Sequence, residues 1–139
     1  MSSIKKRFSV GDKEFSKETE GFIVAEGACN HLCIMDNAFK MIDETANAKA
    51  DAIKFQTYSA DKISTKSAVS YGNMDTKSQY DYFRQFDRFG RAEYDDLFEY
   101  AKEKDIIAFS TPFDPENAQM LNSVHMPLFK IASCDIQYV

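Results

Sequence analysis

Short apolar runs alternate with amphipathic segments along most of the chain. The apolar runs at residues 22–25, 52–56, 106–109 and 128–132 have the length and composition of buried strands. Segments between them, such as residues 91–101, repeat apolar residues every three or four positions, as amphipathic helices do. This order of strands and helices predicts a parallel sheet with helices packed outside it.

The start of the chain shows a different pattern. Two short strand-like runs flank Gly11-Asp12, a typical turn pair. The sequence therefore predicts a β-hairpin segment over residues 1–20 and an α/β unit over residues 21–139. The four short strands expected in that unit fit either a doubly wound sheet or the first half of an eight-stranded (β/α) barrel.

Turn-forming and helix-capping residues set the expected ends of several elements. Residues 59–78 are polar and contain few apolar anchors, so they are predicted to form the longest loop. Thr111-Pro112 is expected to break the third strand. Asp114-Pro115 is expected to supply the N-cap and the first residue of the last helix.

Two of the predicted strands carry a lysine at their centre. Lys54 lies in the stretch Ala-Ile-Lys-Phe-Gln-Thr at residues 52–57, and Lys130 lies in Pro-Leu-Phe-Lys-Ile-Ala-Ser at residues 127–133. Because strand side chains alternate between the two faces of a sheet, the apolar neighbours of each lysine would meet the helices. Lys54, Gln56 and Lys130 would then point toward the axis of a barrel.

Polar residues stand at the end of each predicted strand. In chain order they are Glu26, Gln56 with Thr57, Ser110 with Thr111, and Ser133 with Cys134 and Asp135. The carboxyl ends of parallel strands share one mouth, where ligands bind in α/β folds. Two buried lysines are costly without a counter-ion, and a bound phosphate or carboxylate surrounded by hydroxyl donors supplies one. The pattern predicts a site for an anionic small molecule.

Each of these residues also has a purely structural interpretation. A single lysine in a strand is often an edge residue, or it extends its charged end to solvent. Glu26 alone is compatible with an ordinary ion pair near the helices. The stretch Cys29-Asn-His-Leu-Cys33 suggests a metal site, but zinc usually needs four ligands and the sequence offers no second cluster. Packing is the better interpretation of these thiols.

The composition narrows the classes of function. The chain has 139 residues, of which 44% are hydrophobic, and a formal net charge of −5 at pH 7. That charge argues against a broad basic face for nucleic acid. No apolar run approaches the roughly 18 residues of a membrane span, and no apolar region of the signal-peptide kind follows the first basic residues. Three cysteines, an odd number, predict reduced thiols and a cytoplasmic protein.

Four motifs resemble those of the sialic acid synthase family, which includes N-acetylneuraminate, legionaminate and pseudaminate synthases. They are Phe-Ile-Val-Ala-Glu at residues 22–26 with Asn30-His31, Ala-Asp-Ala-Ile-Lys-Phe-Gln-Thr at 50–57, Phe-Ser-Thr-Pro-Phe-Asp at 109–114, and Phe-Lys-Ile-Ala-Ser at 129–133. Their order and gaps match the family over nearly the whole chain. One departure is Ala-Glu-Gly-Ala at the end of the first motif, where members commonly have Ala-Glu-Ile-Gly.

The resemblance implies a fold and an activity. The fold is the N-terminal half, about four βα units, of a (β/α)8 TIM barrel, which the family joins to a small antifreeze-like domain. The activity is condensation of phosphoenolpyruvate with an N-acyl hexosamine, such as N-acetylmannosamine, to give a nonulosonic acid and phosphate. Full-length members are homodimers that need Mn²⁺ or Mg²⁺. Their metal ligands, second half-barrel and C-terminal domain are absent from this chain, so we expect the chain alone to be inactive.

The same resemblance implies the site residues. The expected catalytic residues are Glu26, Lys54 and Lys130. The expected substrate-binding residues are Gln56, Thr111, Ser133 and Asp135. In this correspondence both lysines contact phosphoenolpyruvate, Glu26 is the acid beside the reacting centre, and Asp135 faces the sugar.

Two other functions stay open at this point. One is a non-catalytic anion-binding or interaction fragment, or a relic of such an enzyme. The other is a different barrel enzyme that acts on phosphoenolpyruvate or phosphosugars, such as an aldolase. An aldolase of this kind is expected to form a Schiff base on a lysine.

Overall fold

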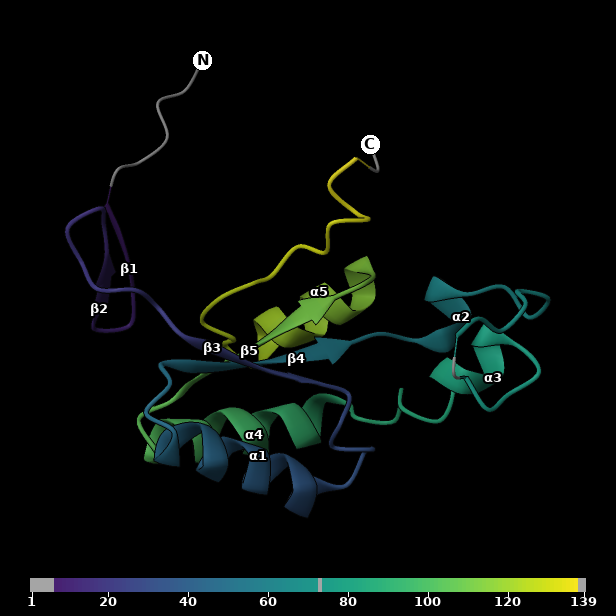
Figure 1. The fold of residues 1–139 in the computed structure, drawn as a ribbon, viewed down its shortest axis with the longest axis horizontal. Coiled ribbons are helices and arrows are strands. Elements are labelled where there is room, and N and C mark those ends of the chain that lie inside the picture. The colour runs from purple at the N-terminus through teal and green to yellow at the C-terminus, as the bar shows by residue number, and fades with distance from the viewer. Residues whose placement is uncertain (1–6, 73, 138–139) are drawn as a thin grey trace.

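A three-stranded parallel sheet forms the centre of the computed structural model, which describes residues 7–72 and 74–137 (Figure 1). Its strands are β3 (Val24–Ala28), β4 (Ala52–Thr57) and β5 (Ile107–Pro112), and β4 lies between the other two. Both pairs are parallel, and helices lie in the crossovers that connect them. The predicted α/β arrangement is thus confirmed, while the outer limits of the two predicted segments lie outside the described residues.

The predicted hairpin precedes this sheet. β1 (Phe8–Val10) pairs antiparallel with β2 (Lys13–Phe15), and Gly11 between them adopts the left-handed backbone conformation, with φ +56°. The ammonium of Lys13 lies 2.7 Å from the Asp51 carboxylate, just before β4. This ion pair ties the hairpin to the amino-terminal end of the sheet.

Two long helices cover one face of the sheet. α1 (Met35–Asn47) and α4 (Arg91–Glu103) lie side by side beneath it in Figure 1, and α5 (Pro115–Ser123) packs against α4 and β5. Asp114 caps α5 by accepting a 2.8 Å hydrogen bond from a backbone N–H, and Pro115 begins the helix. Both features agree with the sequence prediction.

The core lies between these helices and the sheet. Apolar side chains of β4 and β5 meet the apolar stripes of α1 and α4. Burying one such side chain stabilises the fold by about 1.5–3 kcal/mol. The most deeply buried members are Ala38, Ile42, Ala52, Ile53, Phe55, Tyr94, Leu97, Ala101 and Leu121.

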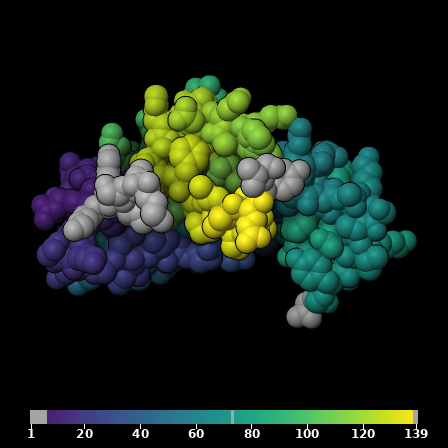
Figure 2. Space-filling model, turned by 90° about the horizontal axis from the view of Figure 1, so that it is seen from above, coloured from purple at the N-terminus to yellow at the C-terminus, as the bar shows by residue number. Residues whose placement is uncertain are grey.

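The segment between β4 and α4 forms a lobe at the carboxyl end of the sheet (Figure 2). It contains two short helices, α2 (Ala60–Ile63) and α3 (Gln79–Phe83). The expectation of one continuous loop over residues 59–78 is therefore wrong, because α2 and a bridge between Val69 and Ser78 fall within it. Side-chain hydrogen bonds of serine and threonine shape much of this segment. The spacing of apolar residues, on which the prediction was based, carries no information about these bonds.

Two predicted strand limits are also wrong. The first strand begins at Val24 and runs to Ala28, so Glu26 lies inside it rather than at its end. Thr111 and Pro112 belong to β5 and do not break it. Pro112 is the last residue of that strand, the position where a missing N–H disturbs the ladder least.

The fourth predicted strand, residues 128–132, does not form a regular strand. It meets β5 through one parallel bridge between Ser110 and Phe129 and one hydrogen bond from the Lys130 N–H to the Ser110 carbonyl. A strand at the edge of a sheet pairs on one side only, so its pairing is easily interrupted. The chain then passes into turns over residues 133–137.

Candidate functional site

The two faces of β4 carry different chemistry. Its apolar side chains are buried against the helices, whereas Lys54 and Gln56 project from the opposite face, as the alternation predicts. The sheet register pairs Lys54 with Glu26 of β3 and Gln56 with Thr111 of β5. Paired residues on neighbouring strands share a face. This surface, called the polar face below, consists of Glu26, Lys54, Gln56 and Thr111.

Lys54 and Glu26 form an ion pair on the polar face. Lys54 Nζ lies 2.6 Å from Glu26 Oε2, and the lysine side chain is 12% exposed whereas that of the glutamate is 57% exposed. The other carboxylate oxygen accepts a 3.1 Å hydrogen bond from the Ala28 N–H. Glu26 also lines an open groove of about 500 Å³ between β3 and α1. A lysine this deeply buried needs a negative partner, and Glu26 fills that role from an accessible position.

Thr111 adds a buried hydroxyl without a partner. Its side chain is 2% exposed, and Oγ1 makes no hydrogen bond within the part of the chain that the structure describes. An unpaired buried hydroxyl costs about 1–3 kcal/mol. Because Thr111 pairs with Gln56 in the sheet register, this hydroxyl lies on the same face as the Lys54 ammonium. The polar face therefore combines one cationic group with a buried hydroxyl that has no partner among the described residues.

The backbone that follows Glu26 is strained and closely packed. Ala28, Leu32 and Cys33 have φ values of +46°, +54° and +55°, which are uncommon for residues with side chains. Gly27 is closely packed, because a Cβ there would lie 3.1 Å from the Phe55 ring and 3.2 Å from a backbone carbonyl oxygen, closer than most Cβ contacts. Strained backbone of this kind is concentrated at functional sites.

His31 is buried in the strained turn. Its ring stacks on Phe89 with the centroids 4.3 Å apart and meets the edge of Phe55 at 5.7 Å. Nδ1 accepts a hydrogen bond from the Cys33 N–H, while Nε2 has no partner among the described residues. Burial lowers the pKa of His31 to about 4, so the ring is neutral near pH 7 with its proton on Nε2. It packs here as an aromatic ring rather than as a cation.

The cysteines contribute hydrogen bonding and packing. The Cys29 thiol lies 3.7 Å from the Gln56 carbonyl oxygen, and burial raises the pKa of Cys29 to about 11, which keeps the thiol protonated. All three cysteines are free. Within residues 7–72 and 74–137, no three His, Cys, Asp or Glu side chains gather as a metal site. The divalent metal implied by the resemblance has no fitting donor set there, and no step below runs through it.

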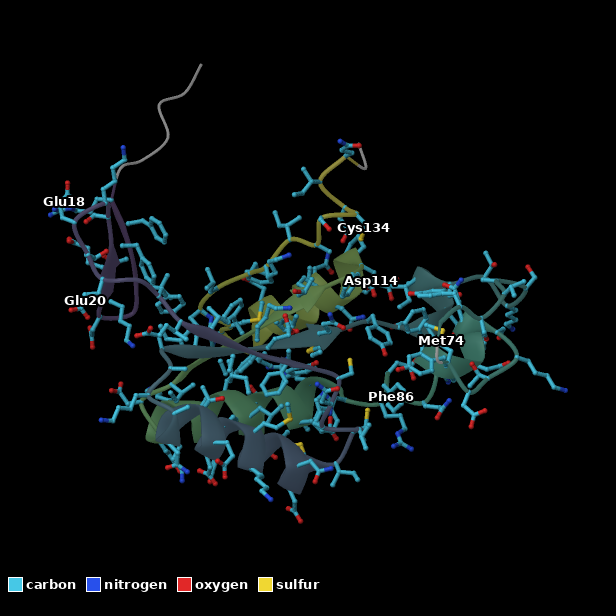
Figure 3. The ribbon with its side chains drawn as sticks, in the orientation of Figure 1. Glu18, Glu20, Met74, Phe86, Asp114 and Cys134 are labelled. Atoms are coloured by element: carbon cyan, nitrogen blue, oxygen red, sulfur yellow. The ribbon has the colours of Figure 1, made fainter. Side chains whose placement is uncertain are left out.

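The side chains of the remaining predicted site residues make no hydrogen bond or ion pair with the polar face among the described residues. Lys130 is exposed, and its ammonium bonds a neighbouring backbone carbonyl over 2.7 Å. Ser133 and Asp135 are exposed in the turns that follow. Cys134 stands between them in the sequence. In Figure 3 it lies on the same side of the molecule as Asp114, toward the carboxyl ends of the strands. Among the described residues, no hydrogen bond or ion pair joins Lys130 to the polar face.

The sequence places Thr57 and Ser110 at the mouth, but both point to the helix side. Thr57 Oγ1 lies 2.6 Å from the Tyr94 hydroxyl and 2.7 Å from Ser110 Oγ. Strand alternation is the reason, since two consecutive residues of a strand cannot face the same side. Sequence reasoning also missed Tyr94 as a polar partner, because its spacing within the helix marks it only as a core residue.

Comparison with known proteins identifies relatives of this chain. A sequence model of the NeuB family matches residues 41–139. The chain is 35% identical over 133 residues to the spore coat polysaccharide biosynthesis protein SpsE of Bacillus subtilis, which covers 95% of this chain and 36% of that protein. It is 31% identical over 127 residues to a pseudaminic acid synthase of Campylobacter jejuni, which covers 86% of this chain and 36% of the synthase. The chain thus spans just over a third of these relatives.

Solved structures show the same fold. The chain matches an N-acetylneuraminic acid synthetase from Leptospira borgpetersenii with a TM-score of 0.80 at 32% identity, over 98% of this chain and 44% of that one. The match to the SpsE structure from Bacillus subtilis has a TM-score of 0.73 at 33% identity, over 95% and 35% of the two chains. These matches confirm the predicted fold class, a portion of a (β/α) barrel. A separate finding is that no helix of the described residues has the length and apolar character to cross a membrane.

Proposed function

We propose that this chain, which belongs to the NeuB family, carries part of the active site of an enzyme that makes a nonulosonic acid, the class that contains sialic and pseudaminic acids. Similarity to a pseudaminic acid synthase and to an N-acetylneuraminic acid synthetase supports the proposal. Because the chain spans just over a third of its relatives, a complete site is proposed to need polypeptide that corresponds to their remainder.

The proposed substrates are phosphoenolpyruvate and an N-acyl hexosamine such as N-acetylmannosamine. Phosphoenolpyruvate carries a phosphate and a carboxylate, and both groups need cationic or hydrogen-bonding partners. The proposal rests on two groups that lie on the same face of the sheet. One is the buried Lys54 ammonium, and the other is the Thr111 hydroxyl, which has no hydrogen-bond partner among the described residues. Glu26 neutralises Lys54 from an accessible position, so an incoming anion can take its place beside the ammonium.

In the proposed reaction, the enol carbon of phosphoenolpyruvate forms a bond to the aldehyde carbon of the open-chain sugar. Water then adds to the resulting oxocarbenium carbon and loses one proton, which balances the proton that the aldehyde oxygen gains. The tetrahedral carbon then expels phosphate by cleavage of its C–O bond. In this step the new hydroxyl gives its proton to the departing phosphate and becomes the keto group of the product. Lys54 is proposed to stabilise the anionic groups throughout. Glu26, once the anion has taken its place beside the ammonium, is proposed to accept and deliver the proton that water loses at its carboxylate.

The other site residues implied by the resemblance stay proposals as well. Gln56 is proposed to bind substrate beside Thr111, Lys130 and Ser133 to contact phosphoenolpyruvate, and Asp135 to face the sugar. The hydrogen bond between the Lys130 N–H and β5 supports this arrangement, because it places that segment next to the strand that carries Thr111. A homodimer and a bound Mn²⁺ or Mg²⁺ are proposed for the full-length enzyme.

Titration calorimetry with phosphoenolpyruvate tests the proposal. We expect the chain to bind this ligand and Lys54→Met to weaken binding by about tenfold or more, because a hydrogen bond to a charged group contributes about 1.5–3 kcal/mol. Lys13→Met is the matched control. Lys13 also pairs with a carboxylate, Asp51, at 2.7 Å, but it lies at the opposite end of the sheet. Equal losses in the two variants, or no binding by the unmodified chain, would contradict the proposal.

A non-catalytic anion-binding function is the second candidate, because the Lys54 ammonium and the Thr111 hydroxyl on the polar face are sufficient for it without any further step. Adding N-acetylmannosamine to the phosphoenolpyruvate complex and assaying released phosphate separates the two functions. Binding without phosphate release by the longest polypeptide that contains this chain indicates the non-catalytic function. Borohydride trapping of substrate on Lys54 would instead indicate a Schiff-base aldolase.

A further inference from the structure

Three hydroxyl groups and one carbonyl form a sealed hydrogen-bond chain directly behind the polar face. The hydroxyls belong to Thr57 of β4, Ser110 of β5 and Tyr94 of α4, and the carbonyl is that of Gln56. The three side chains are 3%, 0% and 1% exposed, respectively. Water is therefore excluded from this chain, and each member depends on the others for its hydrogen bonds.

Counting protons fixes the direction of every hydrogen bond in this chain. The Gln56 carbonyl only accepts, so the Tyr94 hydroxyl donates to it over 3.2 Å. The Tyr94 oxygen accepts in turn from the Thr57 hydroxyl over 2.6 Å. Having used its one proton, Thr57 accepts from Ser110 over 2.7 Å. No hydroxyl is left with a free orientation.

The Gln56 carbonyl oxygen is the end point of this chain and also accepts from a second group. The Cys29 thiol approaches it to 3.7 Å from the turn after β3. One backbone oxygen of β4 is thus held by α4 on one side and by the turn after β3 on the other. The same residue sends its side chain to the polar face, beside Thr111. Fixing the peptide plane fixes the ψ angle of Gln56 and the direction of its Cα–Cβ bond. Because the allowed rotamers depend on φ and ψ, it also restricts χ1 of the Gln56 side chain.

We propose that Tyr94 is a positioning residue, whose hydroxyl holds the Gln56 peptide so that the Gln56 side chain meets bound phosphoenolpyruvate in one orientation. The identity of the ligand rests on the proposed function, but the positioning of Gln56 does not. A tyrosine that served only the core would need its ring alone, and phenylalanine supplies that ring equally well.

The first experiment measures the orientation of Gln56 without any ligand. NMR three-bond couplings that report the Gln56 χ1 angle are compared in the unmodified chain, Tyr94→Phe and Tyr100→Phe. Tyr100 is the matched control, because it lies on the same helix and its hydroxyl donates to the Asp43 carboxylate at 3.0 Å, away from the polar face. We expect couplings averaged over rotamers in Tyr94→Phe alone. Couplings unchanged in a folded Tyr94→Phe variant overturn the inference.

A second variant keeps the inference testable where Tyr94→Phe does not fold. Thr57→Val leaves the tyrosine in place but removes the donor that orients its hydroxyl. We expect partial averaging of the Gln56 couplings in this variant. Unchanged couplings again overturn the inference.

The second experiment links the positioning to binding through a double-mutant cycle. Tyr94→Phe is expected to weaken phosphoenolpyruvate binding by about tenfold, the ratio that corresponds to one neutral hydrogen bond. In a Gln56→Ala background the same substitution is expected to have no further effect, because the side chain that it positions is gone. Equal losses in both backgrounds overturn the inference. If the unmodified chain does not bind phosphoenolpyruvate, the proposed function is refuted. The NMR couplings, which need no ligand, then decide by themselves whether Tyr94 positions Gln56.

Discussion

Successive residues of β4 build two sides of the molecule that differ in how completely they satisfy their own groups. On the helix side, Phe55 is fully buried and the Thr57 hydroxyl has two hydrogen-bond partners. On the polar face, Lys54 relies on the accessible Glu26 carboxylate, and Thr111 Oγ1 has no partner among the described residues. Folding thus satisfies the hydroxyl groups of the helix side, although His31 Nε2 beside Phe55 has no partner among the described residues, and it leaves the polar face with a charge and a hydroxyl that a ligand can bind. That capacity for binding is the physical mark of a ligand site.

Stability and proposed function are therefore separable along β4. The helix side gains from close packing, which tolerates no change of volume. The polar face carries the cost of an unpaired hydroxyl and a half-buried charge, which a ligand can recover on binding. The following predictions test this separation, beginning with the largest expected change in the free energy of unfolding.

Phe55→Ala is expected to have the largest effect. Phe55 is 0% exposed, and its ring packs closely beside Gly27 of β3 and meets His31 edge-on. Its removal leaves a cavity and should lower the free energy of unfolding by about 3–5 kcal/mol. Urea denaturation measures this, with Phe8→Ala as the control, because Phe8 is 52% exposed. Similar losses in both variants would refute the assignment of the helix side as the core.

The helix side is also where sequence alone was most informative. The burial of the apolar residues in β4 and the cap of α5 at Asp114 follow from local rules, namely strand alternation and helix-capping chemistry. The fourth strand illustrates the limit of such rules. Residues 128–132 have the composition of a strand, but regular pairing needs a partner with continuous register, and β5 pairs with this segment through one bridge.

The candidate site was predictable in residue type but not in arrangement. Lys54, Gln56 and Glu26 follow from the motifs, and alternation alone places the first two on one face. The 2.6 Å ion pair and the unpartnered Thr111 hydroxyl depend on the register between strands, which no single-strand pattern encodes. The role of Tyr94 depends on a contact between α4 and β4, so it too appears only in three dimensions.

The second prediction concerns the pH dependence of stability. Burial lowers the pKa of His31 to about 4 in the folded chain, below its ordinary value of 6.5. The unfolded state therefore binds a proton first, so this contribution to stability is complete above about pH 6.5 and declines as the pH falls toward 4. Thermal unfolding over that range should show a steeper decline for the unmodified chain than for His31→Asn.

His125→Asn is the control for this prediction, because His125 is exposed. Its pH profile should follow that of the unmodified chain. Parallel profiles for all three proteins would mean that His31 becomes protonated in the folded chain as readily as in the unfolded one. The turn after β3 would then be more accessible to water than the core beneath it.

Gly27→Ala is expected to have a smaller effect than Phe55→Ala. A Cβ at this position would lie 3.1 Å from the Phe55 ring and 3.2 Å from the Lys54 carbonyl oxygen, and the backbone contact cannot relax freely. Overpacking of this kind costs about 1–3 kcal/mol. Gly21→Ala is the matched control, since nothing lies within 4 Å of a Cβ there. Chemical denaturation of both variants measures the difference, and equal stability would show that β3 can shift away from β4 at this position.

Lys54→Met is expected to change stability least, although it weakens the proposed anion binding by about tenfold or more. The methionine keeps most of the apolar stem, and the substitution removes a charge whose burial is itself costly. Glu26, left without its partner, is 57% exposed and can be solvated. The free energy of unfolding should therefore stay within about 1 kcal/mol of the unmodified value. A loss of unfolding free energy as large as that of Phe55→Ala would make the ion pair a structural element and remove the distinction between the two sides of β4. A stable, folded variant with weakened phosphoenolpyruvate binding would instead mean that Lys54 serves the ligand and not the fold.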